Sequence, residues 1–450
     1  MPRREYKLPG GTETLKVETI APIEDPTPAT PYVNASLLGQ YNTEAILRAH
    51  IERLGGTVEY GTELRSFEQH PNHVEATLVT KNGEKEKTET LTSHWLVGTD
   101  GARGIVRKQL GLSFIGETRT DGAIHLLGLV EVQGLDADHW HQWAEMLNGG
   151  LMLIPTERTG YFSFFLGRVQ DVEKLLVDRD ALVETFLNRV ERQDLVFGKF
   201  EAVSPYRPNI RMVDKFGEGR VFVAGDAAHV HSPAGGQGLN SSVQDAFNLA
   251  WKLTLVEQGL ASPSLLATYT EERLPVIAAM LQKSTKLFEA LQKGDTERAW
   301  KRGGDLRMLG VNYRWSSIVV DERTPKAQSP ESVNPYGSGT DGDLRAGDQA
   351  DDPTSLFSVF RPSHHTALLF NIPAEEMEQV LRVAQKYPSG SVKTVSIYPQ
   401  GTSNPTDRDG HAYAGYQVSP EKPTIVIVRP DGVVGGIYFR GVFDATGDAL

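Results

Sequence analysis

The sequence predicts a mixed fold, α/β with α+β parts, made of several units, and three features carry this prediction. The stretch GRVFVAGDAAHVHSPAGGQGLNSSVQDAFNLAWKL, from Gly219 to Leu253, joins a short apolar strand to a glycine-rich turn and a long amphipathic helix. Residues 112–205 contain several strand-like runs with aromatic side chains, and the tail from about Ser355 alternates strand and helix patterns. A chain of 450 residues is long enough for about two to four such units.

Charge and composition narrow the class of protein. The 46 basic and 58 acidic residues give a formal net charge of -12, which disfavours nucleic acid and anionic membranes as general partners. The chain has no cysteine, so disulfides, thiolate-bound zinc and iron–sulfur clusters are excluded. The start, MPRREYKLPGG, lacks the apolar segment of a secretory signal, and no run approaches the roughly 18–20 apolar residues of a membrane span. We therefore expect a cytoplasmic protein with no nucleic-acid and no membrane partner.

Residues 1–111 are expected to form the first part of an α/β domain. Residues 1–36 are rich in Pro, Gly and Thr and predict an extended loop arm. A helix capped by Asn42 or Thr43 should follow, with Leu47, Ile51 and Leu54 on one face and a stop at Gly55 and Gly56. The predicted strands after it are Val58–Leu64, a hairpin from His73–Thr80 through the Asn82-Gly83 turn, and Trp95–Val97.

Four further segments complete the predicted organisation. Residues 112–205 form a β-rich module with the strands IHLLGLVEV, GLMLIP and YFSFFLGR, and with a helix that places Leu182, Phe186 and Val190 on one face. Residues 206–300 carry the glycine-rich turn, its helix and a second helical region from about Glu271 to Leu291. Residues 301–352 are rich in Gly, Asp, Pro and Ser and predict a linker, and residues 353–450 predict a small α/β unit ending in a hairpin-like pair.

The turn after the strand Val221–Val223 has the chemistry of a cofactor site. Asp226 follows this buried strand directly, at the sheet edge where ligands bind in open α/β folds, and its carboxylate can accept two hydroxyl hydrogen bonds. The glycines allow close approach of a ligand, and the first amides of the helix favour negative charge; these residues are Gly235, Gly236, Gly238, Leu239 and Asn240. The alternative is a tight turn and a helix start without a ligand, but the glycine cluster and the long helix favour the cofactor.

Two weaker motifs lie upstream. In LVGTDGARGIVRK, Asp100 ends a buried strand, Gly101 and Gly104 permit a tight passage, and Arg103, Arg107 and Lys108 suit a pyrophosphate. An Asp-Gly turn before a solvated basic helix explains this motif equally simply. Gln40 precedes a predicted helix, where it could hydrogen-bond a polar ring or merely begin the helix.

Other polar and aromatic residues have simpler explanations. His139 and His141 resemble a metal pair, but the sequence offers them no nearby carboxylate, so no metal site is expected. His229 and His231 flank the predicted cofactor turn, where a packing role is as reasonable as catalysis. The aromatic residues of YFSFFLGR are the alternating faces of one strand, and a subset could line an apolar pocket.

The order of these motifs resembles the single-component FAD-dependent aromatic hydroxylases of the para-hydroxybenzoate hydroxylase and phenol hydroxylase group. The resemblance covers roughly Asn34 to Leu291, from the Gln40 helix through DGARGIVR and the β-rich module to GDAAHVHSPAGGQGLNSSVQDAFNLAWKL and YTEERLPV. It implies a Rossmann-like FAD domain in two parts, an interleaved β-sheet substrate domain and a C-terminal thioredoxin-like domain. Without cysteine this last domain has no CxxC motif, so a dimer contact or a scaffold is the role left for it.

The resemblance also implies a reaction and a set of site residues. NADPH reduces FAD, the flavin reacts with O2, and a C4a-hydroperoxide transfers one oxygen atom to an aromatic substrate. Asp226 would hold the ribityl or pyrophosphate region, Pro233 would lie on the flavin face, and Gln40 would approach the ring. Asp100 and Gly101 would serve FAD and NADPH, and the ring would face Gly236, Gly238, Leu239 and Asn240. The family often has Ser where this chain has Gly104, so that hydroxyl contact is absent.

One family feature is missing from the sequence. The family begins with a βαβ unit that carries GxGxxG, and this chain contains no such turn; Gly10-Gly11 is a loop pair without a preceding strand. We therefore expect the FAD domain to be incomplete and FAD binding to be weak. The strands Leu96-Val97 and Val221–Val223 should lack a neighbour. Two functions follow: an FAD- and NAD(P)H-dependent monooxygenase that can form a homodimer, or a non-redox remnant that serves as a binding or scaffold protein.

Overall fold

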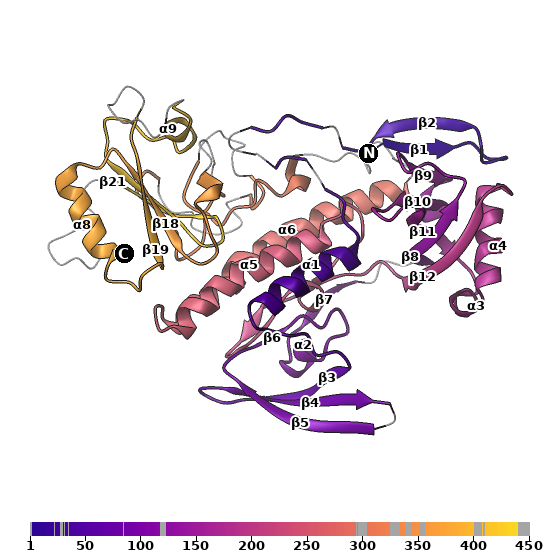
Figure 1. Cartoon of the computed structure of the whole chain (residues 1–450), viewed down its shortest axis with the longest axis horizontal. Helices are drawn as coiled ribbons and strands as arrows, with labels where there is room; N and C mark the ends of the chain where they lie inside the picture. The colour runs from indigo at the N-terminus through magenta and orange to yellow at the C-terminus, as the bar shows by residue number, and fades with distance from the viewer. Residues whose placement is uncertain are drawn as a thin grey trace.

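We describe a computed structural model of the 450-residue chain. It describes residues 2–21, 23–27, 30, 32–34, 36–83, 85–117, 123–293, 295, 304–324, 334–337, 344–350, 356–399, 407 and 410–439. Two long helices, α5 (Gly238–Glu257) and α6 (Ala267–Gln292), run through the middle, between a large β-sheet and a C-terminal α/β unit (Figure 1). The mixed α/β fold that the sequence predicts is confirmed.

A seven-stranded sheet forms one end of the molecule, in the order β12-β8-β11-β10-β9-β1-β2. Helices α3 (Val172–Val177) and α4 (Arg179–Val190) pack on one face, where the predicted apolar residues Leu182, Phe186 and Val190 are buried. The strands are β1 (Pro2–Tyr6), β2 (Thr14–Thr19), β8 (Ile124–Gln133), β9 (Trp140–Trp143), β10 (Leu151–Pro155), β11 (Tyr161–Val169) and β12 (Val196–Tyr206).

The prediction of a loop arm over residues 1–36 is wrong for its first half. β1 pairs parallel with β9 and antiparallel with β2, so it extends the large sheet. Arg3 is buried, and its guanidinium donates to the Gln142 side chain at 3.0 Å and to the Glu18 carboxylate at 2.5 Å. Because the buried residue Arg3 is charged, β1 lacks the alternation of apolar and polar residues from which a strand is predicted.

A small sheet of order β14-β15-β6 lies beside the long helices. It consists of β14 (Gly217–Glu218), β15 (Val221–Val223) and β6 (Leu96–Gly98), and β15 runs parallel to β6. The expectation that Val221–Val223 lacks a neighbour is wrong, because β15 is paired on both sides and its three residues are buried. β6 is paired on one side only among the described strands, and Val97 is 41% exposed.

Smaller elements connect these parts. A sheet of order β16-β13-β7 combines β7 (Phe114–Glu117), β13 (Ile210–Val213) and β16 (His229–Val230). A three-stranded meander combines β3 (Thr62–Gln69), β4 (Val74–Asn82) and β5 (Lys85–Ser93), so the strand predicted over Val58–Leu64 begins later. Helix α1 (Gln40–Arg53) begins at Gln40, and helix α2 (Ile105–Gln109) follows the DGARG motif.

Helix α1 differs from its prediction at its first turn. It begins at Gln40 with Gly39 as N-cap, three residues before Asn42 and four before Thr43, the predicted caps. The Glu157 carboxylate at the β10–β11 turn takes the capping role, accepting from the Gly39 N–H at 3.0 Å and from the Asn42 side chain. None of the residues of α1 is buried, and Leu54 is 85% exposed.

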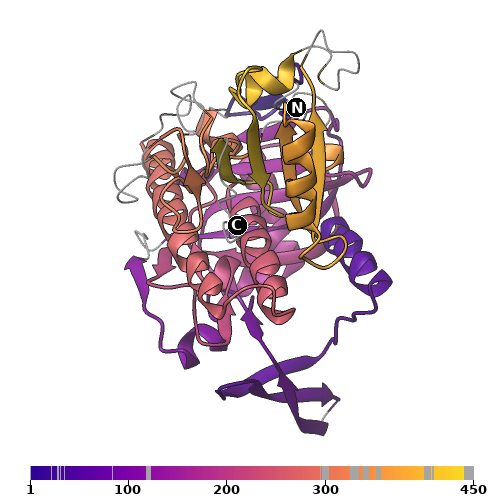
Figure 2. The same cartoon turned by 90° about the vertical axis from the view of Figure 1, so that its left-hand side faces the viewer.

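The C-terminal unit is a five-stranded sheet of order β17-β21-β20-β18-β19 with two helices (Figure 2). Its elements are β17 (Val320–Asp321), β18 (His365–Phe370), α8 (Ala374–Ala384), β19 (Val392–Ile397), α9 (His411–Gly415), β20 (Thr424–Val428) and β21 (Val434–Phe439). The strand, helix, strand and hairpin pattern predicted for the tail is confirmed. Within the predicted linker, Tyr313 and Trp315 are buried in the core that contains α6, and the domain boundaries themselves stay predictions.

Among the described residues, no helix combines the length and the apolar character needed to cross a bilayer.

Candidate functional site

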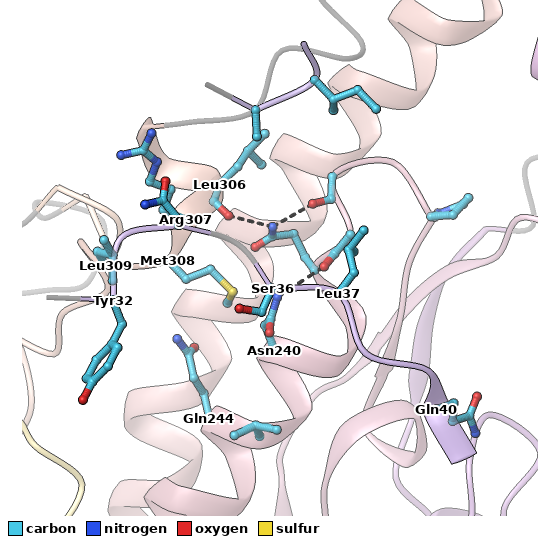
Figure 3. A pocket seen from close by; sticks show the side chains of 18 of the residues that line it. Tyr32, Ser36, Leu37, Gln40, Asn240, Gln244, Leu306, Arg307, Met308 and Leu309 are labelled. Carbon is cyan, nitrogen blue, oxygen red and sulfur yellow. Dashed lines mark hydrogen bonds between the residues drawn. The ribbon is translucent and has the colours of Figure 1, made fainter. Parts of the chain in front are cut away.

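A cavity of about 2270 Å³ lies between the large sheet, the start of α5 and the C-terminal unit (Figure 3). The sheet contributes the face opposite α3 and α4, with Leu127, Ile154 and Phe165, so this wall is apolar. The opposite wall comes from α5 and combines the amide side chains of Asn240 and Gln244 with the apolar side chains of Val243 and Phe247. A mostly apolar cavity with a few polar groups suits a ligand with an aromatic body and a few polar atoms.

The turn before α5 depends on glycine. Gly235 and Gly236 have φ of +94° and +66°, a region that side-chain-bearing residues rarely adopt. A Cβ at Gly236 would meet nothing within 4 Å, so its backbone borders open space in the cavity wall. The N-cap residue Gln237 leaves the first amides of α5 uncapped, because its side chain donates to the carbonyls of Gly235 and Leu306 instead. The positive end of this 20-residue helix therefore faces the cavity without a side-chain acceptor.

A buried carboxylate holds the Gly225-Asp226 turn in place. Asp245 of α5 accepts hydrogen bonds from the Gly225 N–H at 3.0 Å, from His229 Nε2 at 2.7 Å and from Arg273 Nε at 2.8 Å. Burial would raise the pKa of Asp245, but the Arg273 guanidinium and His229 outweigh burial and hold the pKa below its usual value. Asp226 itself is exposed, so its carboxylate is available to a ligand.

The two Asp-Gly motifs are joined by Arg107. This buried side chain donates to the carbonyls of Ala227 at 2.9 Å and Ala102 at 2.6 Å, and it stacks on the Phe114 ring. Lys108 donates to the Arg103 carbonyl. Arg107 and Lys108 thus donate to carbonyls of the chain in this structure, and a role of these basic residues at a pyrophosphate stays a prediction.

The structure explains Gly104. The Asp100 carboxylate accepts from the Val106 N–H at 3.0 Å and so caps α2. A Cβ at Gly104 would lie 2.1 Å from the Asp100 carboxylate oxygen, so a serine could enter only if Asp100 moved away. Asp100 thus has a helix-capping role in this chain, whatever it does for a ligand.

The predicted site residues fall into two groups. Gln40, Pro233, Gly236 and Asn240 line the cavity. The others are not among the lining residues: Asp100, Gly101, Asp226, Gly238 and Leu239. Gly238 backs onto His231, whose Nε2 would lie 3.2 Å from a Cβ at that position.

The pair His139 and His141 has a structural role. His139 Nδ1 lies 2.8 Å from the Asp136 carboxylate, so the expectation that no carboxylate is near is wrong. His141 is fully buried and its Nδ1 lies 2.8 Å from the Tyr6 hydroxyl, and burial lowers its pKa. The Tyr6–His141 contact ties β1 to β9.

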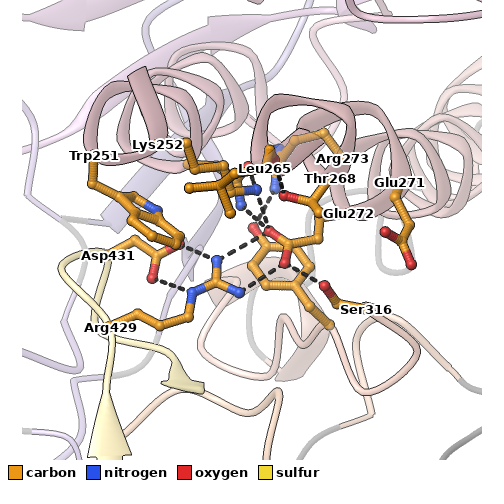
Figure 4. A network of polar contacts seen from close by, with 12 residues as sticks. Trp251, Lys252, Leu265, Thr268, Glu271, Glu272, Arg273, Ser316, Arg429 and Asp431 are labelled. Atoms are coloured by element: carbon orange, nitrogen blue, oxygen red, sulfur yellow. Dashed lines mark hydrogen bonds and ion pairs between the residues drawn. The ribbon is translucent and has the colours of Figure 1, made fainter. Parts of the chain in front are cut away.

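A charged network anchors the C-terminal unit to the helices that carry the site (Figure 4). Arg429, after β20, donates two hydrogen bonds to the Glu272 carboxylate of α6, at 2.7 and 3.0 Å. Lys252 Nζ reaches the same carboxylate at 2.8 Å, and Asp431 accepts from the Trp251 indole at 3.1 Å. Burial would raise the pKa of Glu272, but Arg429 and Lys252 hold it far below its usual value.

Comparison with known proteins places this geometry in a family. Residues 13–284 match the model of an FAD binding domain, and residues 345–440 match the phenol hydroxylase C-terminal dimerisation domain. A flavin-dependent monooxygenase of Mycobacteroides abscessus is 35% identical over 419 residues, which cover 91% of this chain and 76% of that protein. The chain belongs to the FAD-dependent aromatic hydroxylases.

Two other relatives of this hydroxylase extend the comparison. Pentachlorophenol 4-monooxygenase of Sphingobium chlorophenolicum is 28% identical over 90% of this chain and 76% of that protein. The crystal structure of aklavinone-11 hydroxylase with FAD and aklavinone shares the fold, with a TM-score of 0.74 at 24% identity over 97% of this chain and 82% of that one. The predicted family and the predicted fold, including its thioredoxin-like C-terminal domain, are therefore confirmed.

The buried charges of this hydroxylase were not predicted from its sequence. No role was assigned to Asp245, Glu272, Arg273 or Arg429. The helical pattern places the charged residues Asp245 and Lys252 on the apolar side of a long helix, where charged side chains are rare unless an opposite charge pairs with them. Their partners come from α6 and from the β20–β21 turn, far away in sequence.

Proposed function

We propose that this chain is an NAD(P)H-using FAD monooxygenase that hydroxylates a phenolic or other aromatic ring. The observation that carries the proposal is the cavity, which brings the uncapped start of α5 and its glycine turn opposite an apolar sheet face. The relatives named as monooxygenases support the reaction class. The alternative of a non-redox remnant is not favoured by them.

The residues around the cavity fit FAD. Gly235 and Gly236 leave room against the backbone, as a flat ring system requires, and the free amides of α5 offer hydrogen bonds to its carbonyl oxygens. We assign the ring to Pro233, Gly236, Gly238, Leu239 and Asn240. Gln40, which lines the cavity, would approach the ring, and Gly101 would serve FAD from outside the cavity.

Two carboxylates would serve the ribityl and phosphate end. Asp226 is exposed at the end of β15 and is held by the Gly225–Asp245 hydrogen bond, so its side chain can accept from ribityl hydroxyls without reorganisation. Asp100 reaches the same edge of the sheet from β6. Because the sequence has no GxGxxG turn, we expect a weak hold on the pyrophosphate.

When bound, FAD would accept a hydride from NAD(P)H, reduce O2 and supply one oxygen atom to the ring, the other leaving as water. The chain's own contribution is placement. The positive end of α5 stabilises negative charge on the ring system, and Leu127, Ile154 and Phe165 exclude water from the aromatic substrate. O2 use, a homodimer through residues 345–440, and a cytoplasmic location stay predictions.

The test is reconstitution of the full chain with FAD in excess. We expect a shifted flavin absorbance spectrum on binding, and NADPH oxidation that phenols accelerate, with a hydroxylated product for at least one of them. A folded chain that leaves the flavin spectrum unchanged would refute the proposal. Binding without NADPH oxidation would favour a non-redox role.

A further inference from the structure

The turn between β3 and β4 gathers three metal-ligating side chains far from the flavin cavity. His70 and His73 face each other across a two-residue loop, and the His70 N–H donates to the His73 carbonyl at 2.8 Å. Residues opposite each other at such a turn project from the same face of the hairpin. Glu75 is two residues after His73, so the period of a strand returns it to that face.

The donor atoms converge. His73 Nε2 lies 3.4 Å from one Glu75 carboxylate oxygen, and His70 Nε2 lies 4.0 Å from the other. The two imidazole rings stack with centroids 4.5 Å apart, and one donor atom from each of the three residues lies within 4.8 Å of the others. Ligands of a tetrahedral zinc ion, with bonds of about 2.0–2.2 Å, lie about 3.3 Å apart. Because a metal ion lies in the plane of each imidazole that binds it, the two stacked rings must rotate about their side-chain bonds to bind one ion.

The contacts of His73 are compatible with a metal-binding tautomer. His73 Nδ1 lies 2.7 Å from the Asn72 side-chain oxygen, and an Nδ1–H that donates to this oxygen leaves the Nε2 lone pair facing Glu75, 3.4 Å away. His70 Nε2 is buried and has no hydrogen-bond partner. Two ring nitrogens and a carboxylate that face one another are a set of donor atoms that a cation can bind.

The turn is held rigidly enough to act as a preformed site. Arg220, at the start of β15, donates from Nε to the Pro71 carbonyl at 2.9 Å and from its backbone N–H to the Gln69 side chain at 2.8 Å. Its guanidinium also lies over the Trp95 ring, 4.7 Å from the centroid. The loop between the two histidines is thereby fixed to the body of the protein.

We propose that His70, His73 and Glu75 bind one divalent transition-metal ion of the zinc class. Two imidazoles and one carboxylate are a ligand set that zinc accepts, and they leave a fourth position for water. Asn72 orients the His73 ring as an outer-shell partner. The ion would fasten the β3–β4 turn, and the sequence analysis, which expected no metal, did not find it.

The test is calorimetric titration of the full chain with Zn2+ at neutral pH. We expect a saturable site that is weakened at least about tenfold by His70→Gln, by His73→Gln and by Glu75→Gln, and about 10- to 100-fold by Asn72→Ala. His94→Gln is the matched control, because His94 is an exposed histidine beside a carboxylate, 2.6 Å from Glu257, outside the cluster. This control should leave the affinity unchanged.

Three results would overturn the proposal. If the wild-type chain showed no saturable binding, a proton rather than a metal would separate the three groups. If the ligand variants bound Zn2+ as the wild type does, the metal would bind elsewhere. If His94→Gln weakened binding as much as the ligand variants do, the effect would be nonspecific. The Asn72→Ala variant leaves all three ligands in place, so it tests the geometry without removing a ligand.

Discussion

Replacing Glu272 by glutamine should loosen the attachment of the C-terminal unit. The Glu272 carboxylate accepts from two Arg429 nitrogens, Lys252, Asn248 and Ser316, at 2.6–3.0 Å, and its side chain is fully buried. An amide has only one acceptor oxygen. In the best orientation of the glutamine side chain, its amide nitrogen faces the Ser316 hydroxyl, which can accept a hydrogen bond. The same nitrogen also faces an N–H of Arg429, so two donors oppose each other. The substitution further leaves Lys252 and Arg429 buried without their shared anion.

Removing one partner of a buried ion pair costs about 3–5 kcal/mol, and we expect Glu272→Gln to lower the free energy of unfolding by that amount. Glu271→Gln is the control, because the neighbouring Glu271 binds the Ser317 N–H and hydroxyl near the surface; its cost should be about 1 kcal/mol or less. Urea unfolding followed by tryptophan fluorescence measures both, and Trp251 lies beside the network. Equal costs for the two variants would refute the reasoning.

Three further predictions concern other parts of the chain. Asp226→Ala should weaken FAD binding but leave the free energy of unfolding within about 0.5 kcal/mol of the wild type. Asp245→Ala should lower the free energy of unfolding by about 3–5 kcal/mol, because it leaves the Arg273 guanidinium buried without its carboxylate. Equal FAD affinities of Asp226→Ala and the wild type would contradict this prediction. Burial and the Arg429 charge lower the pKa of His365 to about 4, so the unfolded chain binds the extra proton and stability should fall as the pH drops from about 6.5 to 4. The ring is only partly buried, so the loss should be on the order of 1–2 kcal/mol, measured as urea midpoints against pH, and a His365→Phe variant that keeps the same pH dependence would exclude this residue as the cause. Gly104→Ser should displace the Asp100 carboxylate and destabilise the chain by about 1 kcal/mol, the value of a lost helix cap, and an unchanged melting temperature would count against the capping role.

Features that depend on local pattern alone could be predicted from the sequence. The apolar strand Val221–Val223, the glycines before α5 and the apolar face of α4 each follow from period, burial or backbone freedom, and the structure has all three. Asn240 and Gln40 reach the cavity as the motif order suggested. Local pattern and spacing are sufficient for such features.

The sequence was uninformative where charged residues are buried by distant partners. Arg3 pairs with Gln142, and Arg107 binds the Ala227 carbonyl 120 residues away. Such residues look solvated or ligand-binding in the sequence, because their acceptors come from other elements. The loop arm was therefore predicted where β1 lies, and the link that Arg107 makes between two turns was not predicted.

The most direct measurement of the central claim is a flavin titration of the full chain and of a Gly236→Val variant. Gly236 borders the open space beside α5 with φ of +66°, so valine both strains the turn and fills the place assigned to the ring. The account predicts a saturable change in flavin absorbance for the wild type, with NADPH oxidation, and the loss of both in the variant while unfolding remains cooperative. Flavin binding that the valine leaves unchanged, or a folded wild type that binds no flavin, would contradict it.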